Sequence, residues 1–150
     1  MNATDTMRSV REVRVTGPAA LSLVWSDGTT VDLDLTTVIA GATFAALRDP
    51  VEFARVEVGD WGHSLCWASG AELNADALWL ETLSATGHDD ARTFIEWRLR
   101  HGLSLSKAAD AIGVSRRMVA YYSNGDRKVP KPILLACRGW EVGAGVDRAA

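Results

Sequence analysis

The chain has 150 residues, of which 47% are hydrophobic and 23% are charged; this composition is that of a folded protein and excludes an intrinsically disordered one. No apolar run approaches the roughly 20 residues of a membrane-spanning helix, so no membrane partner is expected. The N-terminal residues lack the basic-then-apolar order of a signal peptide. Together with the expectation that Cys66 and Cys137 stay reduced, this favours a cytoplasmic location.

The net charge of −3 conceals an uneven distribution along the chain. Residues 1–90 contain 5 Lys and Arg against 14 Asp and Glu, a balance of −9, whereas residues 91–150 contain 11 against 5, a balance of +6. This split indicates two modules with different partners, of which the second suits a polyanion. Charge alone leaves open that the halves differ by chance.

The acidic part of the chain begins with strand patterns. In residues 12–16 apolar and polar side chains alternate, as in a strand with one buried face. Residues 21–35, LSLVWSDGTTVDLDL, predict a hairpin with a three-residue loop in which Gly28 takes the left-handed conformation. This register places the apolar side chains on one face and Asp32 and Asp34 on the opposite, solvated face. The expected pairs are Leu21 with Leu33, Leu23 with Val31, and Trp25 with Thr29.

Short helices and further strands follow. FAALRDP, residues 44–50, predicts a short helix that ends before its proline, and residues 53–67 predict two more strands joined by a turn. ELNADALWLETL, residues 72–83, predicts a helix with Asn74 as its N-cap. We therefore expect residues 1–83 to form an α+β domain with a small antiparallel sheet and short helices.

No pattern in the chain predicts catalysis. The three histidines, His63, His88 and His101, fall at no metal-ligand spacing, and no Cys or second His is adjacent to any of them. The sequence also lacks a nucleophile–base constellation and a phosphate-binding glycine loop. We therefore expect no catalytic residue, no metal and no cofactor, and we do not expect an enzyme.

Three segments, VWSDGTTVDLDL, FAALRDPVEFARVEV and CWASGAELNADALW, together resemble the bacterial family called domain of unknown function 2442, over residues 11–82. The resemblance implies an α+β fold without assigned catalysis. Because some members accompany toxin–antitoxin-like gene pairs, it also implies a protein-binding module.

A small, polar segment, SATGHDD at residues 84–90, predicts the linker to a second domain at residues 91–150. The first helix of that domain ends at Gly102, and the second carries Ala108 and Ala109, whose small side chains allow two helices to cross closely. N-cap serines mark the beginnings of the second and third helices, at Ser104 and Ser115. This order of helix, alanine-bearing helix, glycine turn and serine-capped helix predicts a DNA-binding helix-turn-helix, and thus an all-α second domain.

Arg116 and Arg117 directly follow the serine that caps the third helix. The first turn of a helix exposes unpaired N–H groups and the positive end of its dipole, so a cation there costs a few tenths of a kcal/mol, up to about 1. Arginine, however, makes bidentate contacts to guanine in the major groove. We therefore interpret both side chains as base-contacting, with an ordinary solvated surface position as the alternative. Val119 and Tyr122, at helical spacing, are expected in the core.

The segment GLSLSKAADAIGVSRRMVAYYSNGDRKVPKPILLA resembles the lambda-repressor-like (Cro/C1-type) domains, and the likeness covers residues 92–139. The resemblance implies that Arg116, Arg117 and Tyr121 meet base edges. It also implies that the loop after the third helix contacts the DNA backbone, through Asn124, Arg127, Lys128 and Lys131.

Two positions depart from that family's pattern. Leu105 stands where the family often has a glutamine, and Ser123 stands where it often has a glutamate that bonds an arginine of the first helix. Arg98 corresponds to that arginine, so we expect it to turn to a phosphate instead. The third helix therefore does without the glutamine and glutamate braces that the family's pattern often supplies.

Several candidate DNA contacts allow a second interpretation. Met118 is expected to face outward, where it would touch a thymine methyl group, and Tyr121 is left open between base contact and packing under the loop. Lys107, Lys128 and Lys131 are interpreted as phosphate contacts, with solubility as the alternative. The full set of candidate DNA-binding residues is Ser104, Lys107, Ser115, Arg116, Arg117, Met118, Tyr121, Asn124, Arg127, Lys128 and Lys131.

The leading hypothesis is a sequence-specific, DNA-binding transcriptional regulator whose partner is double-stranded DNA. The alternative is an antitoxin-like interaction module, whose acidic N-terminal domain binds a partner protein while DNA binding serves autoregulation. Because helix-turn-helix proteins commonly bind repeated half-sites as dimers, a homodimer through an edge of the N-terminal sheet is a further prediction.

Overall fold

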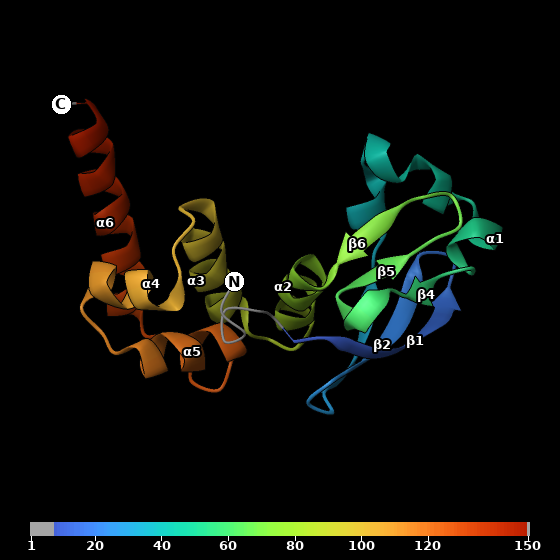
Figure 1. Ribbon diagram of the computed structural model, residues 1–150, viewed down its shortest axis with the longest axis horizontal. Coiled ribbons are helices and arrows are strands. Elements are labelled where there is room, and N and C mark those ends of the chain that lie inside the picture. The colour runs from blue at the N-terminus through green and yellow to red at the C-terminus, as the bar shows by residue number, and fades with distance from the viewer. Residues whose placement is uncertain (1–7, 150) are drawn as a thin grey trace. The chain divides into compact units, whose positions relative to one another are not determined.

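The computed structural model describes the backbone of residues 8–149 and the side chains of residues 8–144. The chain is a mixed α+β protein that divides into two compact units between Thr86 and Gly87. Strands and short helices form the N-terminal unit, and helices α3 to α6 form the C-terminal unit (Figure 1). Among the described residues, no helix combines the length and the hydropathy that crossing a bilayer requires.

The first sheet of the N-terminal unit is antiparallel, with the order β1 (Val10–Gly17), β2 (Ala20–Trp25), β3 (Thr30–Asp34). The predicted hairpin register is confirmed, with Leu21 opposite Leu33 and Leu23 opposite Val31. The Trp25 N–H donates to the Thr29 carbonyl at 2.8 Å. Gly28 has φ 91°, the left-handed conformation that the three-residue loop requires.

The apolar face of this sheet is buried against helix α2 (Ala75–Ala85). The indole N–H of Trp25 donates to the Thr82 hydroxyl at 3.1 Å, and the Trp25 ring meets the Trp79 ring edge-on at 5.3 Å. The predicted N-cap of α2 is confirmed, because the Asn74 side chain accepts from the Ala77 N–H at 2.8 Å. Asp32 and Asp34 are exposed on the opposite face, as expected.

A second antiparallel sheet has the order β4 (Glu57–Val58), β5 (Ser64–Cys66), β6 (Glu72–Asn74). The segment predicted as helical, residues 72–83, begins too early: residues 72–74 form β6, and α2 begins directly after its predicted N-cap, Asn74. Leu73 pairs with Leu65 and is buried, so a strand contact across the chain prevails over the local helical pattern.

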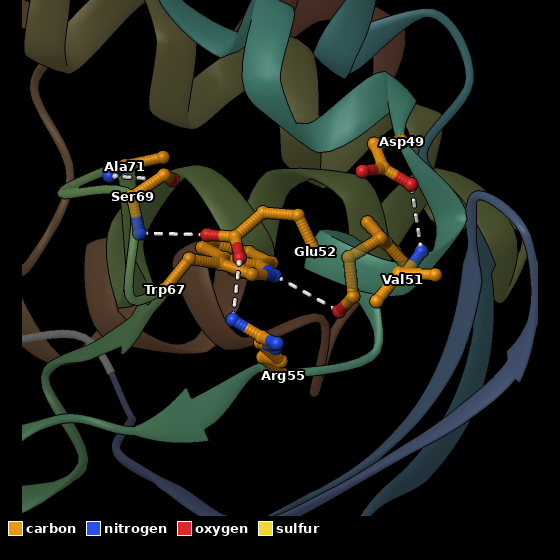
Figure 2. Close-up of polar contacts among 8 residues, drawn as sticks. Asp49, Val51, Glu52, Arg55, Trp67, Ser69 and Ala71 are labelled. Atoms are coloured by element: carbon orange, nitrogen blue, oxygen red, sulfur yellow. Dashed lines mark hydrogen bonds and ion pairs between the residues drawn. The ribbon is translucent and has the colours of Figure 1, made fainter.

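Two 3-10 helices, η2 (Val38–Ala40) and η3 (Ala42–Arg48), precede the short helix α1 (Pro50–Phe53). The predicted helix therefore ends before Pro50, but the proline itself begins α1, for which Asp49 accepts from the Val51 N–H at 3.0 Å. Figure 2 shows how α1 is tied to the turn after β5: the Glu52 carboxylate accepts from the Ser69 N–H at 2.6 Å, and the Trp67 indole donates to the Phe53 carbonyl at 3.0 Å.

The C-terminal unit consists of α3 (Asp89–Arg100), α4 (Leu105–Ile112), α5 (Arg116–Asn124) and α6 (Lys131–Ala149). Its core is built from side chains of all four helices and of the loop before α6, namely Phe94, Trp97, Leu105, Ala108, Ala109, Val119, Tyr122, Val129 and Cys137. The predicted linker at residues 84–90 is too long. Helix α2 continues to Ala85 and α3 begins at Asp89, so only residues 86–88 lie between helices.

Candidate functional site

Helices α4 and α5 begin at the two serines that the sequence predicted as N-caps. The Ser104 hydroxyl accepts from the Lys107 N–H, and the Ser115 hydroxyl accepts from the Met118 N–H, each at 3.1 Å. Between the helices, Gly113 has φ 73°, a conformation that side chains rarely adopt, and its N–H donates to the Ala109 carbonyl at 2.9 Å. This glycine cap ends α4 and lets the chain turn into α5.

Close packing of α4 against α5 rests on the small side chains that the sequence singled out. Ala108 and Val119 are both fully buried, and Tyr122 is 6% exposed and packs edge-on against the Phe94 ring at 5.5 Å. The predictions that Val119 and Tyr122 belong to the core are therefore confirmed. With its inner face fixed in this way, α5 leaves Arg116, Arg117 and Asn124 exposed to solvent.

Arg116 and Arg117 form the first turn of α5, and both side chains are exposed. No acidic residue lies in that turn to offset them, although acidic residues are the ones that the positive end of a helix dipole favours. The arrangement costs the helix up to about 1 kcal/mol per cation. It also places two guanidinium groups, each able to donate to two acceptors at once, at the beginning of an otherwise well-packed helix.

Met118 and Tyr121 are less exposed than these arginines. Met118 is half-buried and packs against the core, so the expectation that it faces outward is wrong. Helical spacing alone does not predict this contact. Tyr121 is also half-buried, and the Arg127 guanidinium lies over its ring, 5.1 Å from the centroid. The Tyr121 carbonyl accepts from the Asp126 N–H at 3.0 Å. Tyr121 thus lies under the loop that follows α5.

This loop, residues 125–130, carries exposed cations on a backbone that is held in place. The Val129 side chain is 2% exposed, and its N–H donates to the Asp90 carboxylate at 2.7 Å. Asp90 therefore anchors the loop to the first turn of α3. Sequence reasoning missed this role because the two residues are 39 positions apart and nothing local pairs them.

The remaining predicted polar contacts occupy several elements of the same unit. Lys107 on α4, Lys128 in the loop and Lys131 at the beginning of α6 are exposed, as are Asn124 and Arg127. The hydroxyls of Ser104 and Ser115 already serve as helix caps.

Arg98 does not turn outward, and the expectation that it reaches a phosphate is wrong. Its side chain is 4% exposed and donates from Nη1 to the Leu103 carbonyl at 3.1 Å, because the bend after α3 brings that carbonyl within reach. Ser123 is buried and donates to the Val119 carbonyl at 2.8 Å, and Leu105 is buried in the core. Ser123 and Leu105 therefore belong to the interior of the C-terminal unit.

Helix α6 is tied to the end of α3 by Glu141. Its carboxylate lies 3.1 Å from Arg100 Nη2 and 2.8 Å from His101 Nε2, and the hydrogen bond from His101, followed by the arginine, lowers the pKa of Glu141. Trp140 packs edge-on against Trp97 at 5.8 Å and covers this side of the small core. Burial, with Glu141 nearby, raises the pKa of the Cys137 thiol to about 11. Within the described part of the chain, no group of three His, Cys, Asp or Glu side chains is placed to hold a metal ion.

Comparison with known proteins bears on both units. Residues 10–82 match the family described as protein of unknown function (DUF2442). A search of curated proteins found no match. Among solved structures, the crystal structure described as "Putative DNA Binding Protein NE0471 from Nitrosomonas europaea ATCC 19718" is similar, with 32% identity, a TM-score of 0.69, and coverage of 94% of this chain and 90% of that one. The chain therefore belongs to the same family as this Nitrosomonas europaea protein. Within this chain, the DUF2442 match covers residues 10–82.

Proposed function

We propose that the chain is a sequence-specific, DNA-binding transcriptional regulator, in which α4 and α5 act as a helix-turn-helix of the lambda-repressor-like kind. The observation that carries this proposal is the pair of exposed arginines in the first turn of α5. Helix α5 would lie in the major groove, where Arg116 and Arg117 would each donate to O6 and N7 of a guanine.

The exposed cations around α5 provide the contacts that do not depend on sequence. Lys107, Arg127, Lys128 and Lys131 would bind phosphates, and the Asp90 carboxylate would keep the loop in position for them. Because every neutralised phosphate releases counterions, affinity should fall steeply as the salt concentration rises. The Nitrosomonas europaea protein, described as a "Putative DNA Binding Protein", supports the proposal because the similarity covers 94% of this chain and thus includes residues of the C-terminal unit.

The proposal is tested by fluorescence anisotropy with the DNA upstream of the protein's own gene. Arg116→Ala and Arg117→Ala should each weaken specific binding by about 1–3 kcal/mol. Arg14→Ala is the matched control, because it removes an exposed arginine from β1. Tight binding that neither α5 variant weakens would exclude α5 as the recognition helix. Light scattering on the DNA complex will show whether one or two copies bind.

A second candidate function, binding of a partner protein as in an antitoxin, is favoured by Trp61. This side chain is 87% exposed, and its backbone has φ 60°, a conformation that is strained for a bulky residue. Exposed tryptophan is typical of the residues that dominate protein interfaces, and the neighbouring Asp60 and the acidic composition of residues 1–90 suit a basic partner.

Trp61→Gly separates this role from folding. Glycine tolerates the positive φ, so the variant should be at least as stable as the wild type, while a partner that copurifies with the full chain should be lost. Recovery of the same partners with Trp61→Gly would contradict the role.

A further inference from the structure

A groove of about 520 Å³ lies between α3 and α6 in the C-terminal unit. Thr93, Trp97 and Arg100 line it from one face of α3, and Lys131, Leu134, Leu135, Cys137, Arg138 and Glu141 line it from α6. Its volume is within the range of sites that hold small molecules. Of the residues assigned to DNA contact, only Lys131 lines this groove, and Trp61 does not line it.

The floor of the groove is apolar. Trp97 and Cys137 are 1% and 3% exposed, while Leu135, at the edge, is 51% exposed. An occupant that covers Leu135 would therefore remove apolar surface from water.

The rim of the groove is cationic. Lys131 and Arg138 are exposed, and within the described part of the chain no carboxylate lies at ion-pair distance from either side chain. The one acidic residue of the lining, Glu141, is engaged by Arg100 and His101 and so does not neutralise them. An occupant should therefore carry negative charge at one end and an apolar body that covers the floor.

We propose that this groove binds a small amphipathic carboxylate, with its carboxylate at Lys131 and Arg138 and its apolar body over Trp97 and Leu135. Because Lys131 is also one of the cations assigned to phosphate contact, an occupied groove would weaken DNA binding; this regulatory consequence rests on the proposed function, whereas the binding itself does not.

Calorimetric titration of the full chain with 2-naphthoate and with decanoate, in the absence of DNA, tests the site. Saturable binding of at least one acid is expected, with Kd below roughly 1 mM. Lys131→Ala and Arg138→Ala should each weaken it by roughly tenfold, as for loss of a charge-assisted contact. Arg14→Ala, which removes an exposed arginine of β1 outside the groove, should leave it unchanged. The neutral alcohols 2-naphthalenemethanol and decanol should bind far more weakly than the acids.

Absence of binding by both acids at millimolar concentration would overturn the inference, as would equal binding of acids and alcohols or affinities unaffected by Lys131→Ala and Arg138→Ala. Sedimentation velocity provides the remaining arm. If the free chain dimerises and Leu135→Asp dissociates it, the groove is an interface between copies and the ligand assignment is wrong.

The regulatory consequence is measured by titrating the acid that binds into a preformed DNA complex. Release of DNA by the acid, lost in Arg138→Ala, is expected. If the chain binds the acid but no DNA, the proposed function fails while the groove assignment stands. If it binds DNA but neither acid, the groove assignment fails alone.

Discussion

The charged residues of the two units relate differently to the backbone around them. In the N-terminal unit, Asp27, Asp34 and Asp49 each accept a hydrogen bond from the backbone N–H two residues further along, at 2.9 to 3.0 Å. Each carboxylate therefore stabilises the turn or helix start where it stands. In the C-terminal unit, Arg116 and Arg117 stand at a helix start that favours the opposite charge. A charged side chain that destabilises the helix on which it lies is a better indication of a functional role than one that stabilises its own turn.

The largest effect on stability is expected from Asp90→Ala, which would leave the Val129 N–H without its acceptor. An unsatisfied buried donor costs about 1–3 kcal/mol, and the released loop should also weaken DNA binding through Arg127 and Lys128. Urea unfolding and anisotropy measure the two effects. Asp90→Asn retains an acceptor oxygen and serves as the control; if Asp90→Ala is as stable as the wild type, the loop does not depend on this bond.

The two units should respond alike where each uses a helix cap. Asn74→Ala and Ser115→Ala each remove an acceptor from the first turn of a helix and should lower the free energy of unfolding by about 1 kcal/mol. Asn74→Ala should leave DNA affinity unchanged, whereas Ser115→Ala should lower it. Equal DNA affinities of the two variants would remove the distinction between the units.

A smaller, pH-dependent effect is expected at Glu141. The hydrogen bond from His101 and the nearby Arg100 lower the pKa of this carboxyl from its ordinary value of 4.5. As the pH falls, the Glu141 carboxyl is therefore protonated in the unfolded chain before it is protonated in the folded chain. The stabilisation is complete above pH 4.5 and is lost as the pH falls through the lowered pKa of the folded state. As a partly exposed ion pair it contributes only about 0.2–1 kcal/mol.

Glu141→Gln should flatten this part of the stability profile between neutral pH and pH 3, measured by thermal unfolding. Glu96→Gln, which removes another glutamate of the same unit from its i,i+4 pair with Arg92, is the control. An acid limb that is unchanged in Glu141→Gln would assign the pH dependence to other carboxylates.

Local patterns predicted a good part of both units. The hairpin register followed from the turn at Gly28 together with strict alternation, and the caps at Asn74, Ser104 and Ser115 followed from residues within one turn of each helix start. These features depend on residues that are close together in the sequence, so local sequence patterns predict them.

Features that depend on distant partners were missed. Strand β6 exists because Leu73 pairs with Leu65, and the loop before α6 is held by Asp90. Arg98 is buried and donates a hydrogen bond to the Leu103 carbonyl, a contact that helical spacing does not predict. The exposure of Arg116 and Arg117, in contrast, followed from the helix pattern, and the DNA contacts assigned to them stay a prediction.

The central claim, that these two arginines serve DNA rather than the fold, is tested most directly by measuring stability and DNA affinity on the same variant. Arg117→Ala removes a cation from the positive end of α5, so its free energy of unfolding should rise by a few tenths of a kcal/mol, while its affinity for the specific DNA falls by about 1–3 kcal/mol. Opposite signs are the predicted result. A variant that loses stability and retains DNA affinity would show that the arginine supports the fold, and would contradict the account.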